Sequence, residues 1–457
     1  MTALAPLLAA ALAAAPARLD VPGLGKVAIH APSGPPARVV LLLSGAGGLD
    51  AAASELAAAL AAKGALVVGI DTPAYLASRP EGRCVYPAGD LEVLAQDVEK
   101  RRAMPEYLRP VVVGHSRGAA LAWAAVSNAP AGTFAGAVAA APCPDRPLPV
   151  KLCAHGAPPR TLDGGTLPPL AKPPAPVEIV AGAEDATCPA GAAEELAQAL
   201  GARFAKVPGA GHALSGPVDA AIADAVARLA PGPGPAASAP PAPGAVVPVS
   251  DLPLVEVPTR TPGRSLALLI TGDGGWVGAD KALAAALADG GVSVIGLDAL
   301  RYFWKKRTRE ETARDVARVL AHYRAAWGRA ETVLVGYSRG ADIVPLLAVD
   351  LPPEERAHVA LVAMLGPSTF AELEVHAIDI FTSKRRANAI STEPAVRANG
   401  GAIPMICFHG ADEHDSLCPR LGDLPWVKDV LHQGGHRLGG DETAEMAREI
   451  LAALPPR

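Results

Sequence analysis

Residues 333–340 read VLVGYSRG, and residues 111–118 read VVVGHSRG. In each stretch an apolar run typical of a buried strand leads into Gly-x-Ser-x-Gly, and an apolar helical pattern follows. This order predicts a sharp strand-to-helix turn with the serine at its apex, because the flanking glycines let strand and helix approach closely. The two stretches therefore make Ser338 and Ser116 candidate nucleophiles. An ordinary turn in which the serine only caps the helix is the alternative interpretation.

The two halves of the chain repeat one another around these turns. LLLSGAGG at residues 41–48 is echoed by LLITGDGG at residues 268–275, 227 positions later. In both halves short apolar runs alternate with longer helical patterns, which predicts a mostly parallel sheet with helices on both faces. We therefore expect two tandem α/β domains, at residues 18–230 and 251–457, that arose by duplication. The Pro/Ala/Gly-rich residues 231–250 are predicted to be an extended linker.

Composition and charge exclude several classes of protein. Of the 457 residues, 50% are hydrophobic and 19% are charged, which excludes disorder for most of the chain. The net charge of −5 argues against nucleic-acid binding, which needs a basic face. No internal run of about 20 apolar residues predicts a transmembrane helix. Residues 1–17 are rich in Ala and Leu, end in Ala-Pro-Ala, and predict a secretory signal peptide; a plain Ala-rich start is the alternative.

Six cysteines bear on the compartment. Four lie in the first half and two in the second, and an even number in each half is what disulfides within each domain require. Reduced, buried thiols are the alternative. None of the cysteines forms a Cys-x-x-Cys motif, so we expect no zinc site, and no cofactor is indicated. With the signal segment, the cysteines favour an oxidising compartment such as the periplasm.

A serine nucleophile needs a base and an orienting acid, which follow it in the order Ser, acid, His in an α/β-hydrolase. In the second half His436, in a Gly-Gly-His stretch before the last helical pattern, is the predicted base. The predicted acid is Asp415, chosen by aligning the Cys-Pro pair that both halves share, with Asp412 as the alternative in the same loop. The equivalent residues of the first half are Asp185 and His212.

An oxyanion hole is also needed, since negative charge develops on the carbonyl oxygen during acyl transfer. One donor is expected to be the backbone N–H of Arg339, which follows the nucleophile. The other is expected from the Gly-rich turn after the first strand, at Asp273 or Gly274. A plain tight turn is the alternative. No Gly-Lys-Ser/Thr follows this turn, so it does not match a phosphate-binding loop.

Several further motifs run through the second half in a fixed order. They are TGDGGW at 271–276, LDALRYFW at 297–304, GYSRGAD at 336–342, DSLCP at 415–419 and GGH at 434–436. Together they resemble the VirJ/AcvB family of bacterial virulence-associated proteins. The two-domain layout is similar to AcvB rather than to the single-domain VirJ.

This resemblance implies a periplasmic serine hydrolase of the α/β-hydrolase fold that cleaves the aminoacyl ester of lysyl- or alanyl-phosphatidylglycerol. By carry-over, Ser338 is the nucleophile, His436 the base and Asp415 the acid. Signature positions make further candidates for substrate binding: Asp273, Trp276, Tyr302 and Tyr337. Asp273 either holds the cationic amine of the substrate or caps the following helix, and the segment around Tyr302 either lines the acyl pocket or packs the next helix.

Other functions stay open at this point. A general esterase, thioesterase or peptidase fits the same triad, and a non-enzymatic secretion accessory protein needs no triad. Ser116, Asp185 and His212 form either a second active site or the remnant of one in a binding or structural domain. The expected partner is an aminoacylated phospholipid, and basic residues at 305–307 and 384–386 either meet an anionic membrane or are simply solvated. The oligomeric state is left open.

Overall fold

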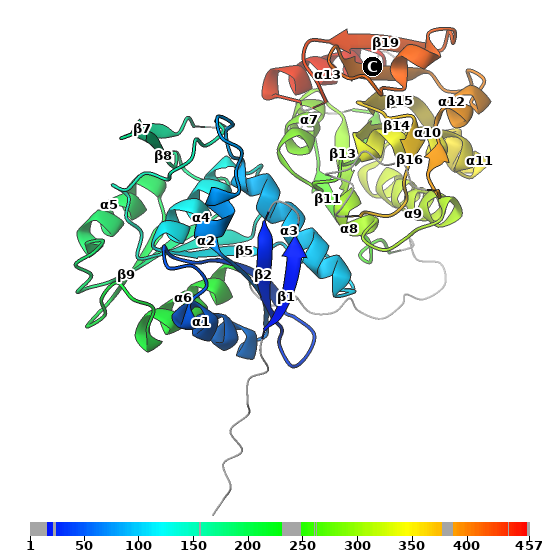
Figure 1. The fold of residues 1–457 in the computed structure, drawn as a ribbon. Coiled ribbons are helices and arrows are strands. Elements are labelled where there is room, and N and C mark those ends of the chain that lie inside the picture. Colours follow the sequence, from blue (N-terminus) through cyan, green and yellow to red (C-terminus); the bar gives the residue numbers. More distant parts are fainter. Residues whose placement is uncertain are drawn as a thin grey trace, which may run out of the picture. The chain divides into compact units, whose positions relative to one another are not determined.

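A computed structural model describes residues 16–21, 24–154, 157–230, 248–259, 261, 263–376, 387–436 and 438–454 (Figure 1). The predicted signal segment up to residue 15, the predicted linker up to residue 247 and the basic residues 384–386 lie outside the described residues. The chain forms two compact units. The first holds residues 1–95 and 108–234, and the second holds residues 96–107 and 235–457.

The first unit is built on an eight-stranded sheet in the order β1-β2-β4-β3-β5-β6-β9-β10. From β4 onward all neighbours are parallel, whereas β1 and β2 pair antiparallel at one edge. The strands are β1 (Ala17–Val21), β2 (Gly25–His30), β3 (Arg38–Leu43), β4 (Ala65–Ile70), β5 (Val111–His115), β6 (Gly136–Ala140), β9 (Val177–Gly182) and β10 (Arg203–Val207). A separate small hairpin pairs β7 (Arg160–Leu162) with β8 (Gly165–Leu167).

Helices cover both faces of this sheet because its strands alternate buried apolar side chains toward each face (Figure 1). Helices α1 (Ala51–Ala62) and α6 (Gly216–Leu229) pack on the face that carries Val40 and Leu42. Helix α4 (Arg117–Asn128) packs on β5 and β6. The remaining helices are α2 (Thr72–Ala77), α3 (Pro87–Arg101) and α5 (Ala190–Leu200).

The second unit repeats this plan with a seven-stranded sheet in the order β11-β13-β12-β14-β15-β18-β19. Only β11 runs antiparallel to its neighbour. The strands are β11 (Leu254–Val257), β12 (Ser265–Ile270), β13 (Ser293–Leu297), β14 (Glu331–Tyr337), β15 (Val359–Leu365), β18 (Met405–Gly410) and β19 (Val427–His432). Strands β16 (Phe370–Ala371) and β17 (Ile390–Ser391) form a separate short pair.

Helices α7 (Gly278–Asp289) and α13 (Gly440–Ala452) pack together on one face of the second sheet. Helices α9 (Arg309–Trp327) and α10 (Arg339–Asp350) contact each other and also the sheet. Shorter elements are α8 (Ala299–Tyr302), α11 (Pro353–Arg356), α12 (Glu393–Ala398) and the 3-10 helix η2 (Cys418–Leu421). The six strands from β4 to β10 and the six from β13 to β19 follow the same order, so the predicted tandem α/β architecture is confirmed.

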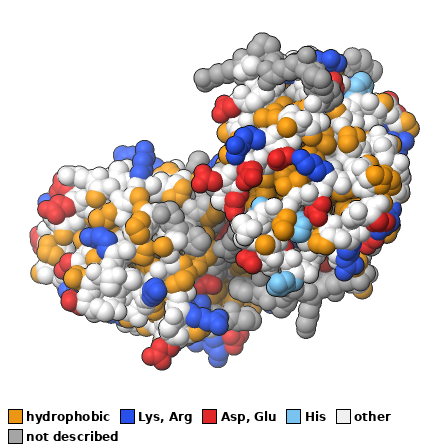
Figure 2. Space-filling model, turned by 90° about the horizontal axis from the view of Figure 1, so that it is seen from above, with side chains coloured by type: hydrophobic (Ala, Val, Ile, Leu, Met, Phe, Trp, Pro, Cys, Tyr) orange, Lys and Arg blue, Asp and Glu red, His pale blue; other side chains and the backbone are white. Residues whose placement is uncertain are grey.

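Three disulfides tie the loops of these units: Cys84–Cys153, Cys143–Cys188 and Cys407–Cys418. They confirm the predicted pairing within each half, and the alternative of reduced thiols is wrong. Among the described helices, none combines the length and the apolar character needed to cross a membrane. On the face seen in Figure 2, acidic and basic side chains are interspersed over the described parts of both units.

Candidate active site

The second unit presents Ser338 at a strained turn between β14 and α10. Ser338 has φ +53° and ψ −118°, a conformation that non-glycine residues rarely adopt and that costs about 1–3 kcal/mol. Both neighbouring glycines are required by contact: a Cβ at Gly336 would overlap the backbone of Gly340, and one at Gly340 would overlap the Ile270 carbonyl. The turn predicted from the Gly-x-Ser-x-Gly stretch is therefore present, with the serine at its apex.

His436 lies beside this serine, as predicted. Its Nε2 is 2.7 Å from Ser338 Oγ, and its Nδ1 is 2.6 Å from Glu413 Oε1. Such a chain lets the imidazole accept the hydroxyl proton while the carboxylate holds the ring and stabilises its charged form. The side chain of Glu413 is 7% exposed and that of His436 is 48% exposed, so the acid is buried and the base faces outward.

The identity of the acid corrects the sequence analysis. Glu413, not Asp415 or the alternative Asp412, contacts the base. The Glu413 N–H donates to the Gly410 carbonyl, and the Gly410 N–H donates to Glu413 Oε2, so the side chain folds back over the end of β18. Asp412 and Asp415 are exposed instead.

Alignment from the Cys-Pro pair missed Glu413 because this loop is longer in the second half than in the first. Counting from the glycine that ends each strand finds it. Asp185 is the third residue after Gly182, and Glu413 is the third after Gly410.

The pKa shifts of the pair follow from this contact. The hydrogen bond to Glu413 raises the pKa of His436 above its usual value, although burial acts in the opposite direction. Burial by itself raises the pKa of Glu413, but the hydrogen bonds from His436 and the Gly410 N–H outweigh it and leave that pKa below its usual value. The pair is therefore arranged to favour a negative carboxylate beside an imidazole that readily accepts a proton.

Tyr337, predicted to bind substrate, is placed to hold the base. Its hydroxyl donates to the backbone carbonyl of His436 at 3.1 Å, and its ring stacks on the imidazole with centroids 5.9 Å apart. Both contacts fix where the backbone and ring of His436 lie. Tyr337 is thus a positioning residue for the base.

The Gly-rich turn after β12 lies against the nucleophile, as an oxyanion hole requires. A Cβ at Gly272 would be 3.3 Å from Ser338 Cβ, and Arg339 begins α10, where first-turn N–H groups lack helical acceptors. The side chains of Asp273, in the Gly-rich turn, and Arg339, at the start of α10, form an ion pair that links these two segments. The Arg339 guanidinium also donates to the carbonyls of Glu372 and Glu374.

This ion pair corrects the expectations for Asp273. Helix α7 has Val277 as its N-cap, so Asp273 does not cap it. The carboxylate is already paired with a guanidinium, and its side chain is 44% exposed. Asp273 therefore does not offer a free negative charge to a substrate amine.

Family models match both halves of the chain. Residues 264–457, which include Ser338, Glu413 and His436, match the model of the bacterial virulence protein VirJ. The second half is a VirJ domain. Residues 38–154 match the α/β-hydrolase fold, and residues 97–216 match a serine hydrolase model. The chain is thus a serine hydrolase with two α/β-hydrolase units, and the predicted resemblance is confirmed.

Solved structures that resemble the chain cover about one unit of it. Est1E from Butyrivibrio proteoclasticus is 15% identical, covers 47% of this chain and 97% of its own, and has a TM-score of 0.33. A truncated carbohydrate esterase from gut microbiota is 14% identical, covers 48% of this chain and 98% of its own, and has a TM-score of 0.36. For an alpha-beta serine hydrolase homologue from Coxiella burnetii the corresponding values are 16%, 47%, 95% and 0.33. No curated protein is significantly similar to the chain.

Two other residues predicted to bind substrate lie in the core of the VirJ domain. Trp276 is 7% exposed and packs on Gly296, where a Cβ would overlap its ring. Tyr302 is 1% exposed, and its hydroxyl donates to Asp315 at 2.8 Å. Both side chains are buried and packed against other core residues, so the expectation that they touch substrate is wrong. Of the alternatives for the segment around Tyr302, packing is the correct one.

The first unit brings its three predicted residues together as well. His212 Nε2 is 3.1 Å from Ser116 Oγ, and His212 Nδ1 is 2.8 Å from Asp185 Oδ2. In both units the serine, histidine and acid therefore sit within hydrogen-bond reach. Within the described parts of the chain, no group of three or more His, Cys, Asp or Glu side chains is arranged to hold a metal ion.

Proposed function

We propose that the VirJ domain hydrolyses the aminoacyl ester of an aminoacylated phosphatidylglycerol, with Ser338 as nucleophile, His436 as base and Glu413 as orienting acid. The observation that carries the proposal is the continuous hydrogen-bonded chain from Ser338 Oγ through His436 to Glu413. A serine hydroxyl activated in this way attacks carbonyl carbons of esters, and an aminoacyl ester is an activated one.

The proposed reaction proceeds in two acyl-transfer steps, in each of which His436 accepts and then returns a proton. Ser338 Oγ attacks the ester carbonyl carbon while His436 Nε2 takes the hydroxyl proton, and the N–H groups of Arg339 and the turn at Asp273 and Gly274 stabilise the oxyanion. The carbon–oxygen bond to the glycerol breaks, and His436 returns the proton to the leaving oxygen. Water then attacks the aminoacyl-serine by the same route. The products are the free amino acid and phosphatidylglycerol.

An exposed carboxylate close to the base supports the choice of a cationic acyl group. Asp415 is exposed in the same loop as Glu413, and its charge contributes to raising the pKa of His436, after the larger contribution of the hydrogen bond to Glu413. A negative charge at the rim of the site favours an acyl group that carries an ammonium. We therefore assign Asp415, first predicted as the acid, to recognition of the substrate amine.

The setting of the reaction is part of the proposal. Three disulfides favour an oxidising compartment, and the VirJ match favours the periplasm. The exposed Lys305 and Lys306 are available to meet an anionic membrane surface, where each basic residue contributes about 1 kcal/mol. The enzyme would then reach its lipid substrate from the membrane surface.

The test uses the purified full-length protein and vesicles that contain lysyl-phosphatidylglycerol. We expect release of lysine, and loss of that release in Ser338→Ala by about 10⁴-fold or more. Ser250→Ala, an exposed serine of the same unit, is the matched control and should keep wild-type activity. Asp415→Asn should raise KM for the lysyl lipid and leave short neutral esters less affected.

Three results would overturn the proposal. One is lysine release that survives in Ser338→Ala. Another is turnover of neutral p-nitrophenyl esters with no activity on the lipid, which would favour a general esterase. The third is biological function that persists without Ser338 and His436, which would favour a non-enzymatic role.

A further inference from the structure

The first unit has the same strained strand-to-helix turn at Ser116 that the second unit has at Ser338. Ser116 has φ +53° and ψ −114°, within a few degrees of the values at Ser338. A Cβ at Gly114 would overlap the backbone of Gly118, and a Cβ at Gly118 would overlap the Leu43 carbonyl. A purely structural copy has no need of a serine held in a conformation that costs about 1–3 kcal/mol. The turn therefore points to retained chemistry.

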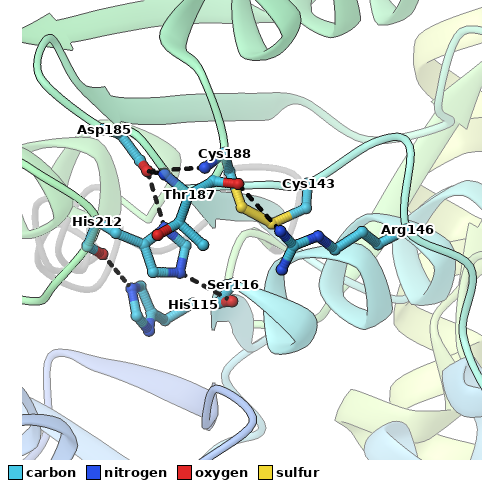
Figure 3. Close-up of a disulfide and its surroundings, with 8 residues drawn as sticks. All are labelled: His115, Ser116, Cys143, Arg146, Asp185, Thr187, Cys188 and His212. Carbon is cyan, nitrogen blue, oxygen red and sulfur yellow. Dashed lines mark hydrogen bonds and ion pairs between the residues drawn. A yellow bond between two sulfur atoms is a disulfide. The ribbon is translucent and has the colours of Figure 1, made fainter.

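The acid of this site is fully oriented by its loop (Figure 3). Asp185 has a side chain that is 0% exposed, and its Oδ2 contacts His212. Its Oδ1 accepts hydrogen bonds from the N–H groups of Thr187 and Cys188, both at 2.8 Å. Both carboxylate oxygens of Asp185 thus have hydrogen-bond partners, which fix the orientation of the carboxylate toward His212.

A disulfide anchors this acid loop. Cys188, whose N–H holds the carboxylate, is bonded to Cys143 just after β6 (Figure 3). From the same side Arg146 donates to the Thr187 carbonyl at 3.2 Å. The loop that presents Asp185 to His212 is therefore tied to the end of the neighbouring strand.

The base has a positioning residue of its own, His115. Its Nε2 lies 2.8 Å from the backbone carbonyl of His212, the same contact that Tyr337 makes with His436. Burial lowers the pKa of His115, despite the opposing hydrogen bond to His212. Since a carbonyl oxygen can only accept, His115 donates to it through Nε2–H. Two chemically different side chains at equivalent positions thus do the same work in the two units.

A small cavity of about 210 Å³ opens at Ser116. Its walls include Gly45, Ala46, Ala53 and Leu214, and none of the described residues that line it is a lysine or an arginine. The lining carboxylate, Asp50, caps α1 by accepting from the Ala53 N–H at 2.8 Å. Pockets for drug-sized ligands have volumes of about 300–1,000 Å³, so this one suits a small acyl group.

The surroundings of the two serines also differ in charge. Ala46 occupies the position in the first unit that Asp273 occupies in the second. The first site therefore lacks the counterpart of the ion pair between Asp273 and Arg339. Arg117, the counterpart of Arg339, is exposed rather than buried. The cavity at Ser116 is therefore small and its described lining is mostly apolar, with Asp50 as the carboxylate, which caps α1.

We propose that the first unit is a second, independent active site that hydrolyses esters of short, uncharged acyl groups. Ser116 Oγ attacks the carbonyl carbon, His212 takes the proton and returns it to the leaving alcohol, and water releases the acid from the acyl-serine. The N–H groups of Arg117 and Ala46 are the oxyanion donors. This site does not depend on the function proposed for the VirJ domain.

The experiment removes the VirJ nucleophile and asks what remains. In full-length Ser338→Ala, a fluorophosphonate probe should label Ser116, as shown by peptide mapping, and p-nitrophenyl acetate and butyrate should be hydrolysed. Adding Ser116→Ala should lower that kcat/KM by at least about 100-fold, whereas adding Ser33→Ala, an exposed loop serine, should not. The decanoate ester should be a poor substrate because of the cavity volume.

His115 supplies a second readout. In the Ser338→Ala background, His115→Ala should lower kcat, and His115→Tyr, which copies the VirJ site, should restore most of it. No label on Ser116 in a protein that melts like wild type would overturn the proposal. So would equal esterase activity with and without Ser116, or a preference for the decanoate ester.

Discussion

Replacing Glu413 by Gln tests the acid that the structure assigns to the VirJ site. The substitution keeps the size of the side chain but removes the charge that faces His436 Nδ1 at 2.6 Å. A charge-assisted hydrogen bond of this kind is worth about 1.5–3 kcal/mol in the ground state. Its loss in the transition state is larger, because the imidazolium that forms there loses its partner and the ring can adopt the wrong tautomer.

The expected loss in kcat is about 10⁴-fold, which corresponds to about 5.5 kcal/mol. The assay measures kcat/KM with a p-nitrophenyl ester in a Ser116→Ala background, so that only Ser338 reports. The acidic limb of the pH profile should also shift. Because the hydrogen bond to Glu413 raises the pKa of His436 above its usual value, wild-type activity should fall as the pH drops through this raised pKa. In Glu413→Gln that limb should move to lower pH.

Asp412→Asn is the matched control, since Asp412 is the exposed acid next to Glu413 in the same loop. Its activity should stay within about twofold of wild type. The reasoning would be refuted if Asp412→Asn or Asp415→Asn abolished hydrolysis of a neutral ester while Glu413→Gln kept it. An unchanged pH profile in Glu413→Gln would refute the electrostatic part.

Three further predictions follow from single contacts. Tyr337→Phe removes the hydrogen bond to the His436 carbonyl and should lower kcat about 2- to 10-fold in steady-state assays, with little change in KM. Trp276→Ala should lower the free energy of unfolding by about 3–5 kcal/mol in denaturant titrations, because the ring is in the core; an effect confined to KM would instead indicate substrate contact. Replacing Cys407 and Cys418 by Ser opens the loop that carries Glu413 and should cost about 2–3 kcal/mol of stability together with activity, and an unaffected melting temperature and kcat would contradict this.

The two acid loops illustrate how far a repeat can be extrapolated. Cys188 and Cys418 both precede a proline, yet their disulfide partners lie at different places in the fold: Cys143 follows β6, whereas Cys407 lies in β18. The distance from strand end to cysteine also differs between the halves. Alignment through the cysteines therefore pointed to Asp415, whereas the end of β18 and its turn place Glu413 against the base.

The sequence by itself predicted the duplicated α/β architecture and, in each unit, the serine and histidine that the structure brings together. Each of these depends on local order: an apolar strand, a glycine pair that permits a strained serine, and a histidine before the last helix. Such signals are carried by neighbouring residues and survive without knowledge of the packing.

Only the tertiary structure decided which carboxylate serves His436, that Asp273 is paired with Arg339, and that Trp276 and Tyr302 belong to the core. These outcomes depend on loop paths and on side chains distant in sequence. The sequence does not distinguish between several acids in the loop after β18. A shift of one residue along its irregular backbone, from Asp412 to Glu413, turns the side chain from the solvent toward His436. That direction is set by the whole fold, because the loop is shaped by the strand end, the disulfide and the helix that surround it.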